Sequence, residues 1–446
     1  MVARWMAGLA VAVLAALGAC GGGSEARPAQ HGASVARAAR AHPSAPSLRD
    51  HLAALQRIAS AHGGTRSAGT PGDTATAEYL QERLRAAGLR VRTQRVTFPF
   101  TAERAPPQVT RVDGPDRRLR PNRDVRTQLY SGPADVEARV RAIQVRPGRT
   151  TASGCRPGAF AALRPGEIAL VQRGVCTLRR KALNAQRAGA AAVLILNDGV
   201  GGRTGPFAGT LGGPGARIAV LGLSSQAGAA LARASRPRLR VRVRSVSETR
   251  TTHNVIAELG DPTPRRIVMA GAHIDSVPAG PGINDNGSGT SAVLDSAEAL
   301  ARTRLPDGVQ LRFGFWGAEE LGLFGSRHYV AGLDRAARRA HAAYLNLDMV
   351  GTPGGSRGVY VGTDPADRRI ERLLRVALGG RIRPERLGGS SDHASFRRAG
   401  IPVGGLFTGL DRCYHRRCDT LRNVDVGLAE EMARALRSAL RALIRS

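Results

Sequence analysis

From His253 to the C-terminus the sequence alternates short apolar runs with segments of helical character. The runs NVIAEL, RIVMAGA, QLRFGFW and AAYLNLDM have the length and composition of buried strands. A helix over Thr290–Arg302 and another from Leu321 are expected between them. Strands that alternate with helices of about 10–15 residues favour a layered α/β domain with a largely parallel sheet. We therefore expect a three-layer α/β/α architecture with a mixed, largely parallel central sheet.

In such sheets, functional groups gather at the carboxyl ends of the strands. Side chains with metal-binding chemistry collect at these places: His273 after RIVMAGA, Asp285 in the Gly-rich loop GINDNGSG, Glu319 and Glu320 after QLRFGFW, Asp348 after AAYLNL, and His415 in the late loop CYHRRC. Two histidines and three carboxylates suit zinc or a similar divalent ion. One carboxylate of the adjacent glutamate pair is left over.

A spare carboxylate beside a metal centre indicates hydrolysis. Zinc lowers the pKa of bound water from about 15.7 to about 7, and a nearby carboxylate can take the proton as the water attacks. One glutamate would then hold metal and its neighbour would act as general base. Asp285 is a reasonable bridge between two metal ions. Asp275, two residues after His273, is placed to accept the other imidazole N–H.

Five motifs carry a family resemblance: GAHIDSV, GINDNGSGT, FWGAEELGLFGS, NLDMVG and CYHRRCDT. They resemble the motifs of the co-catalytic dizinc aminopeptidases of metallopeptidase family twenty-eight, especially the secreted aminopeptidase S and aminopeptidase Y types. The resemblance covers about Leu48–Phe98 and His253–Ser446. It implies two zinc ions: His273 and Asp348 bind one, Glu320 and His415 bind the other, Asp285 bridges them, and Glu319 is the general base.

The same resemblance has two finer implications. It implies a cis peptide bond between Asp285 and Asn286. It also implies that Tyr414 donates a hydrogen bond to the developing oxyanion, with simple packing as the alternative role.

The activity implied by the resemblance is removal of N-terminal residues from peptides with a free N-terminus. Two alternatives on the same fold are a carboxypeptidase and a glutaminyl cyclase. A third is a non-catalytic protein that binds peptides. Zinc stoichiometry separates them, since two ions per chain favour the aminopeptidase, one favours a cyclase and none favours a binding protein.

Beyond about Ala105 the sequence changes to Pro/Arg-rich loops and short strands. Expected elements are the strands Glu167–Val171 and Ala191–Leu196, the helix Leu178–Ala188, and an edge strand at Leu239–Val246. The segments GEIALVQRGVC and LRRKALNAQRAGAAAVLILN resemble a protease-associated domain, a mostly-β α+β fold. The expected layout is peptidase domain at 47–105, protease-associated domain at 106–247, and peptidase domain again at 248–446.

The first peptidase segment, residues 47–105, has the sequence pattern of two helices followed by a strand. Apolar residues at helical spacing predict a helix over Leu48–Ala61, and a second is expected from Asp73 or Thr74 to Ala87. The alternating run Val91–Phe98 predicts a strand.

The N-terminal sequence MVARWMAGLAVAVLAALGAC has the short apolar core of an export signal. Its ending, LGAC, resembles a bacterial lipobox, so residues 1–20 are expected to be a lipoprotein-type signal peptide and Cys20 the lipid-modified residue. An ordinary cleaved signal is the alternative. Residues 21–46 are Gly/Ala/Ser/Pro-rich and predict a flexible linker. The chain is therefore expected in the cell envelope, tethered to the membrane only through Cys20, or secreted.

Four further cysteines gain meaning from this expected export, because disulfides persist outside the cytoplasm. Proximity along the chain suggests Cys155–Cys176 and Cys413–Cys418, although four cysteines permit three pairings.

The charge balance does not indicate a nucleic-acid partner. Lys+Arg is 66 against 35 Asp+Glu, a net charge of +31, which alone suggests a polyanionic partner. However, Lys181 is the only lysine, the arginines are spread evenly, and aromatic residues are 4% with no nucleic-acid motif. We interpret the excess as compositional bias.

Overall fold

The computed structural model describes residues 46–114, 117–386 and 388–446. Its helices are α1 (Leu48–Ala61), α2 (Pro71–Ala86), α3 (Leu178–Arg187), α4 (Ser225–Arg233), α5 (Gly289–Leu300), α6 (Phe324–Ala331), α7 (Arg335–Ala340), α8 (Pro365–Leu378), α9 (His393–Arg398) and α10 (Val426–Ile444), with short helical turns η1 (Pro157–Phe160), η2 (Val200–Gly202), η3 (Ile283–Ser288) and η4 (Leu421–Asn423).

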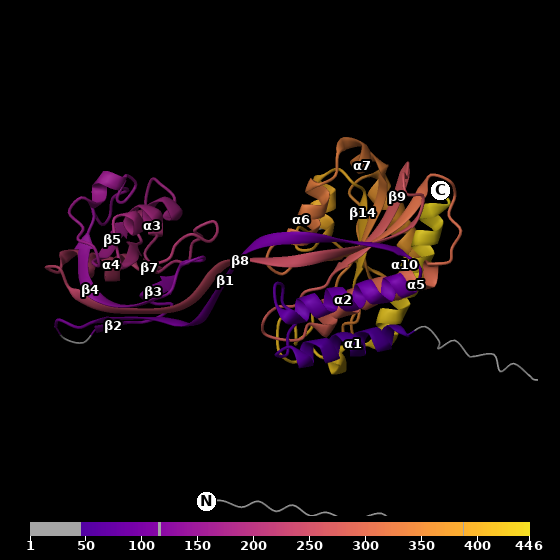
Figure 1. The fold of residues 1–446 in the computed structure, drawn as a ribbon, viewed down its shortest axis with the longest axis horizontal. Coiled ribbons are helices and arrows are strands. Elements are labelled where there is room, and N and C mark those ends of the chain that lie inside the picture. The colour runs from indigo at the N-terminus through magenta and orange to yellow at the C-terminus, as the bar shows by residue number, and fades with distance from the viewer. Residues whose placement is uncertain (1–45, 115–116, 387) are drawn as a thin grey trace, which may run out of the picture. The chain divides into compact units, whose positions relative to one another are not determined.

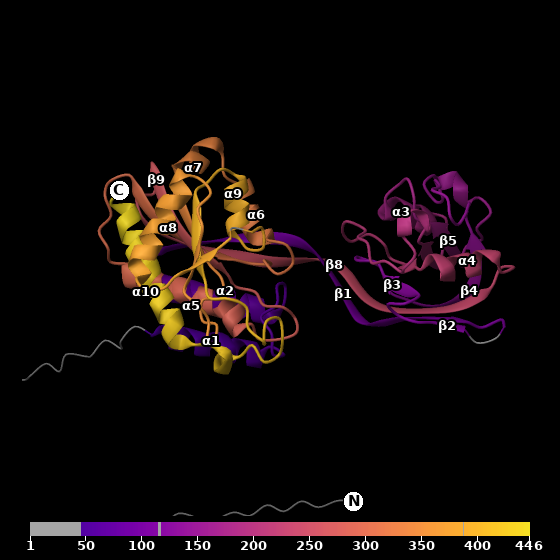
Figure 2. The same ribbon diagram turned by 180° about the vertical axis from the view of Figure 1, so that it is seen from behind.

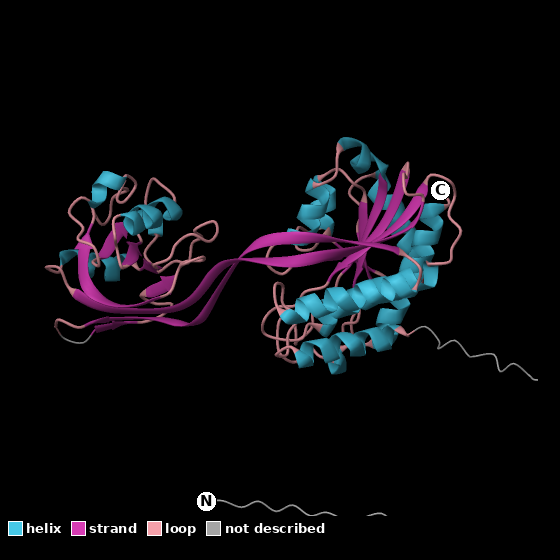
Figure 3. Ribbon diagram, viewed as in Figure 1, coloured by secondary structure: helices cyan, strands magenta, loops and turns pink. Residues whose placement is uncertain are grey.

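The strands belong to a large domain and to the inserted domain, and β1 and β8 contribute to both. They are β1 (Arg90–Arg111), β2 (Arg117–Leu119), β3 (Val125–Thr127), β4 (Ala134–Ala142), β5 (Ile168–Gln172), β6 (Ala192–Leu196), β7 (Ala219–Leu223), β8 (Arg238–Gly260), β9 (Arg266–His273), β10 (Val309–Trp316), β11 (His341–Leu347), β12 (Gly358–Tyr360), β13 (Arg383–Glu385) and β14 (Val403–Phe407). Figures 1 and 3 show their arrangement.

The large domain is built on the strand order β13-β12-β14-β11-β9-β10-β8, with β1 on the other side of β8. Strands β14, β11, β9 and β10 are parallel to one another, whereas β8 and β1 add antiparallel pairs. The mixed, largely parallel sheet predicted from the sequence is confirmed. Because β9 lies between β10 and β11, the carboxyl ends of these strands meet at one edge.

Helices cover both faces of this sheet. Successive strand residues point to opposite faces, so Val268 and Ala270 of β9 join a core with α1, α2, α5, α8 and α10, while Ile267 and Met269 pack on the side of α6 and α9. Figures 1 and 2 show these two helical layers from opposite directions. The three-layer α/β/α architecture is therefore confirmed.

The inserted domain has its own sheet and cores. Strands β4, β5, β6 and β7 are parallel, and β3 is antiparallel to β7. Helices α3 and α4 pack against this sheet through two hydrophobic cores. The fully buried Lys181 of α3 donates a hydrogen bond from Nζ to the main-chain oxygen of Ser153, and its Nζ lies 3.5 Å from Cys155 Sγ. The sole lysine of the chain thus serves as an internal structural group.

The predicted edge strand at Leu239–Val246 is wrong. These residues belong to β8, which pairs with β1 on one side and with β4 on the other. The alternation LRVRVRSV does form a strand, in which Leu239, Val241 and Val243 are buried and the arginines between them are more exposed. Alternation reports which face meets solvent, however, and carries no information on whether a neighbouring strand lies beside it.

Helix α5 begins one residue before the expected Thr290, at Gly289, and helices α2 and α6 differ more from expectation. Helix α2 starts at Pro71, where the fixed φ of proline suits the first helical turn. Helix α6 starts at Phe324, after Leu323 adopts a left-handed φ of 60°. The residues from Glu319 to Leu323 therefore form a turn, which leaves the glutamate pair outside the helix.

Both predicted disulfides are present. Cys155 is bonded to Cys176, and Cys413 to Cys418. The predicted signal peptide with Cys20 lies outside the described residues. Within the described part of the chain, no helix combines the length and the apolar character that crossing a membrane requires.

Candidate metal centre and active site

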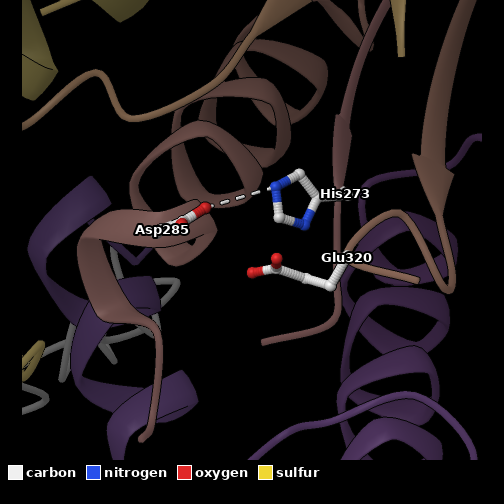
Figure 4. Close-up of side chains that lie close together, drawn as sticks. All are labelled: His273, Asp285 and Glu320. Carbon is white, nitrogen blue, oxygen red and sulfur yellow. Dashed lines mark ion pairs between the residues drawn. The ribbon is translucent and has the colours of Figure 1, made fainter. Parts of the chain in front are cut away.

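The predicted ligands come together at the carboxyl edge of the large sheet. His273 is the last residue of β9, Glu319 and Glu320 follow β10, and Asp348 follows β11. Asp285 lies in η3, just before a cis peptide bond to Asn286. Figure 4 shows His273, Asp285 and Glu320 directed into one space from separate segments.

A first group of ligand atoms surrounds His273, whose side chain is only 1% exposed. Its Nε2 lies 3.4 Å from Asp285 Oδ1 and 3.4 Å from Asp348 Oδ1. Strand β9 holds this imidazole between β10 and β11. The position of the ring is therefore set by the core of the sheet.

A second group surrounds His415, whose side chain is 39% exposed. Its Nε2 lies 3.2 Å from Asp285 Oδ2 and 3.1 Å from Glu320 Oε2. Asp285 thus presents one oxygen to each histidine. This is the arrangement that a carboxylate bridging two cations requires.

The spacing of these atoms fits zinc. Bonds of 2.0–2.1 Å in a tetrahedral site place neighbouring N and O ligands about 3.3 Å apart, and the four distances above lie between 3.1 and 3.4 Å. In addition, Asp348 Oδ1 and Glu320 Oε1 are buried without a hydrogen-bond partner. Buried carboxylate oxygens need a partner, and a divalent cation would supply it for both.

Glu319 stands slightly apart from the other carboxylates. Its Oε2 lies 3.8 Å from His273 Nε2, farther than the oxygens of Asp285 and Asp348. His273, Glu319 and Asp348 could nevertheless hold one ion among them. Burial raises the pKa of Glu319 well above its usual range, as a group that exchanges protons near neutral pH requires.

The charged groups of the site shift one another's pKa values. Burial opposes charge on Asp285, yet the two histidines outweigh it and lower its pKa to about 2. Contacts with Asp285 and Glu320 raise the pKa of His415 to about 10. Burial raises the pKa of Glu320 to about 7. The four acidic groups and two histidines therefore form one electrostatic unit into which cations fit.

Tyr414 lies beside this unit. Its ring stacks on that of His415, with centroids 3.8 Å apart. Burial, together with the nearby carboxylates, raises the pKa of its hydroxyl to about 12. The phenol is therefore a proton-bearing donor at neutral pH.

Comparison with known proteins identifies the family. The model of peptidase family M28 matches residues 254–440, and the model of the PA domain matches residues 138–231. An aminopeptidase of Pseudomonas aeruginosa (strain UCBPP-PA14) is 36% identical over 413 residues, which cover 84% of this chain and 76% of that protein. The chain belongs to peptidase family M28.

Two further proteins are similar to this M28 chain over most of its length. The probable lipoprotein aminopeptidase LpqL of Mycobacterium tuberculosis is 34% identical over 470 residues, 94% of this chain and 89% of the relative. The solved structure of BSAP, a zinc aminopeptidase from Bacillus subtilis, is similar with a TM-score of 0.57 and 27% identity, covering 89% of this chain and 95% of that one.

In the M28 chain, Asp275 supports two neighbouring segments. The main-chain oxygen of Asp275 lies 3.1 Å from His273 Nδ1, and its carboxylate Oδ1 lies 3.7 Å from the same atom. The carboxylate accepts hydrogen bonds from the amides of Glu319 and Glu320, at 3.0 and 3.4 Å. One aspartate therefore positions the imidazole through its main chain and the glutamate pair through its side chain.

Asp419 has a similar role that sequence reasoning missed. This buried residue follows Cys418, and its two carboxylate oxygens accept from the amides of Asn284 and Asp285 at 2.8 and 3.0 Å. It links the disulfide loop that carries His415 to the segment that carries Asp285. The only sequence signal was its place inside the quoted motif CYHRRCDT.

Asn286 and Arg66 were also missed. Asn286 donates to Leu347 O and accepts from the amide of Met349, so it holds the residues on either side of Asp348. The fully buried guanidinium of Arg66 donates to main-chain oxygens of the segment between the two ligand-bearing elements, those of Ile274, Pro281 and Gly282. The loops that carry the predicted ligands are thus joined by polar side chains from outside the predicted ligand set.

Proposed function

We propose that this chain is an exported dizinc aminopeptidase that removes N-terminal residues from peptides. The observation that carries the proposal is the position of Asp285, with one oxygen facing His273 and the other facing His415. Both histidines have a further carboxylate at ligand spacing. This arrangement supports two cation positions that share one carboxylate.

The proposed ligands are His273 and Asp348 at one zinc, Glu320 and His415 at the other, and Asp285 between them. Bound zinc would activate a water molecule and polarise the carbonyl of the scissile peptide bond. Glu319 takes the proton of the attacking water and delivers it to the leaving amine. The hydroxyl of Tyr414 donates a hydrogen bond to the developing oxyanion.

The substrate class rests on family relations. The M28 relatives of P. aeruginosa and M. tuberculosis carry the names aminopeptidase and probable lipoprotein aminopeptidase. We infer peptides with a free N-terminus as substrates. The name of the second relative also supports a lipid anchor at Cys20 and a place in the cell envelope. We further propose residues 106–247 as the extent of the protease-associated domain.

Hydrolysis of a substrate panel tests the activity. Aminoacyl-anilides should be cleaved, whereas N-blocked peptides and peptides that report cleavage at the C-terminus should not. A chelator should abolish turnover, and added zinc should restore it. Cleavage of C-terminal reporters alone would instead indicate a carboxypeptidase.

Zinc content measured on the same preparation tests the site. About two ions per chain agree with the proposal. One ion together with cyclisation of N-terminal glutamine would favour a glutaminyl cyclase, and none would favour a binding protein.

A further inference from the structure

A cavity in the inserted domain has a cationic rim. Its volume is about 460 Å³, within the range of small-ligand sites. The lining arginines come from the end of β1, from β2 and the segment after it, and from α4: Arg111, Arg117, Arg118, Arg120, Arg123 and Arg233. Asp124 is the only acidic residue among the described residues of the lining. We call this cavity the arginine pocket.

Most of this positive charge has no counter-charge in the described chain. Arg111 pairs with Asp113 at 2.9 Å, and Arg120 with Asp124 at 3.2 Å. For Arg117, Arg118, Arg123 and Arg233, no side-chain hydrogen bond or ion pair forms with a described residue. Among the described residues, four of these six arginines therefore form no ion pair, although Arg123 still interacts electrostatically with Asp124.

The register of the strands concentrates charge further. Arg111 of β1 and Arg117 of β2 are directly opposite each other across the antiparallel pair. Like charges in such cross-strand positions are destabilising. An anion bound between the strands and α4 would relieve this repulsion.

The general abundance of arginine does not by itself explain the pocket. On the neighbouring strands β4 and β8, arginines are matched with acids: Arg238 with Glu137 at 2.8 Å, and Arg240 and Arg242 with Asp135 at 3.2 and 3.1 Å. These three arginines have acidic partners, whereas exposed arginines elsewhere in the domain, such as Arg156 and Arg180, have none among the described residues. The pocket differs from both cases because it gathers six arginines around one cavity.

We propose that the arginine pocket binds a phosphate group. A guanidinium donates two parallel hydrogen bonds to an oxyanion, and a phosphate offers more oxygens and more charge than a carboxylate. The buried side chains of Leu119, Leu231 and Leu239 form an apolar part of the lining, which suits a phosphate ester that carries an apolar substituent. The described lining contains no aromatic side chain for stacking bases.

Two double variants of the full-length chain test the proposal. Arg118→Gln/Arg123→Gln removes two exposed rim charges that form no ion pair with a described residue. Arg156→Gln/Arg180→Gln removes the same charge from exposed positions of the same domain outside the pocket. Both carry Cys20→Ser, so that no acyl group contributes to binding. Circular dichroism and thermal unfolding should show both to be folded.

The first measurement is calorimetric titration with inorganic phosphate. We expect the pocket variant to lose affinity by about tenfold, while the control variant matches the parent chain. Phosphate that binds at the metal centre contributes equally to both and cancels in the comparison.

The second measurement is co-sedimentation with vesicles of phosphatidylglycerol in phosphatidylcholine. Weaker sedimentation of the pocket variant identifies a lipid headgroup as the source of the phosphate. Equal sedimentation, with the difference in phosphate affinity retained, identifies a soluble phosphate or phosphate ester. If neither measurement separates the pocket variant from the control, the proposal is overturned.

Discussion

His273 and His415 face different oxygens of the same carboxylate, that of Asp285, yet the chain holds them by different means. His273 ends a strand with paired neighbours on both sides, and its side chain is 1% exposed. His415 lies in a loop closed by the Cys413–Cys418 disulfide, and its side chain is 39% exposed. The first position is a product of the fold as a whole, whereas the second depends on a few local contacts.

If the proposed dizinc centre forms, this difference predicts unequal metal affinities. A zinc ion at His273 would meet a preformed, buried group, so little freedom would be lost on binding. A zinc ion at His415 would have to stabilise a loop as well. We therefore expect the His415 position to release its ion first during chelation, and to be the one that mutations outside the ligand set weaken.

The largest effect is expected from replacing Glu319. This residue could be a third ligand beside His273 and Asp348 instead of the general base, which would change the His273 position. As general base, Glu319→Gln should lower kcat by about 10²- to 10⁴-fold and leave zinc content unchanged. Steady-state kinetics and metal analysis of one preparation check this. Loss of one zinc ion would move Glu319 into the ligand set, and near-normal turnover would remove it from catalysis.

Removal of each histidine probes the two positions directly. His415→Ala should keep about one zinc ion and lower kcat/KM by more than about 100-fold, beyond the effect of supporting residues at metal sites. His273→Ala should lose zinc and also lower the melting temperature, since it empties a buried space in the core. The exposed His328→Ala serves as control. Equal zinc loss and equal stability in both variants would contradict the comparison.

The disulfide of the His415 loop should matter for one position only. Cys413→Ser/Cys418→Ser frees a loop with a sequence separation of 5. In the chain-entropy model this costs about 2 kcal/mol, or roughly 30-fold in affinity at the His415 position. Zinc titration with a competing chelator measures it, with Cys155→Ser/Cys176→Ser as the matched control. A uniform loss at both positions would mean that the loop supports the whole centre.

The smallest effect is expected from Asp419→Asn. An asparagine offers one acceptor where the aspartate accepts from two main-chain amides. We expect about tenfold weaker zinc binding at the His415 position, the lower end for supporting groups of metal sites. The exposed Asp307→Asn is the control. If Asp419→Asn matches it in titration and in kcat/KM, Asp419 has no positioning role.

The large sheet and the meeting of the ligands could be predicted because both depend on regular rules. Apolar runs alternating with helical segments imply parallel strands, and residues after such strands meet at one edge. His273, Glu320 and Asp348 follow this rule. The first residues of the helices were harder to predict from the sequence. Helix α6, for example, begins only after Leu323 adopts a left-handed conformation, which no local pattern indicates.

The supporting network could not be predicted in the same way. Asp419 and Asn286 bind main-chain groups that belong to segments far away in the sequence, and no local pattern reveals which amide a buried side chain will reach. The same limit applies to β8, whose alternation gave its exposed face and not its neighbours. Side-chain type and spacing indicate chemistry, whereas partner choice is decided by tertiary structure.

Because Lys181 is buried, its chemical labelling can be used to follow opening of the inserted domain. Acylating reagents that seek primary amines have a single side chain to modify in this protein, and in the native state its nitrogen is shielded and engaged with Ser153. The rate at which that one residue becomes labelled would therefore measure how often this part of the molecule opens, with no engineered probe.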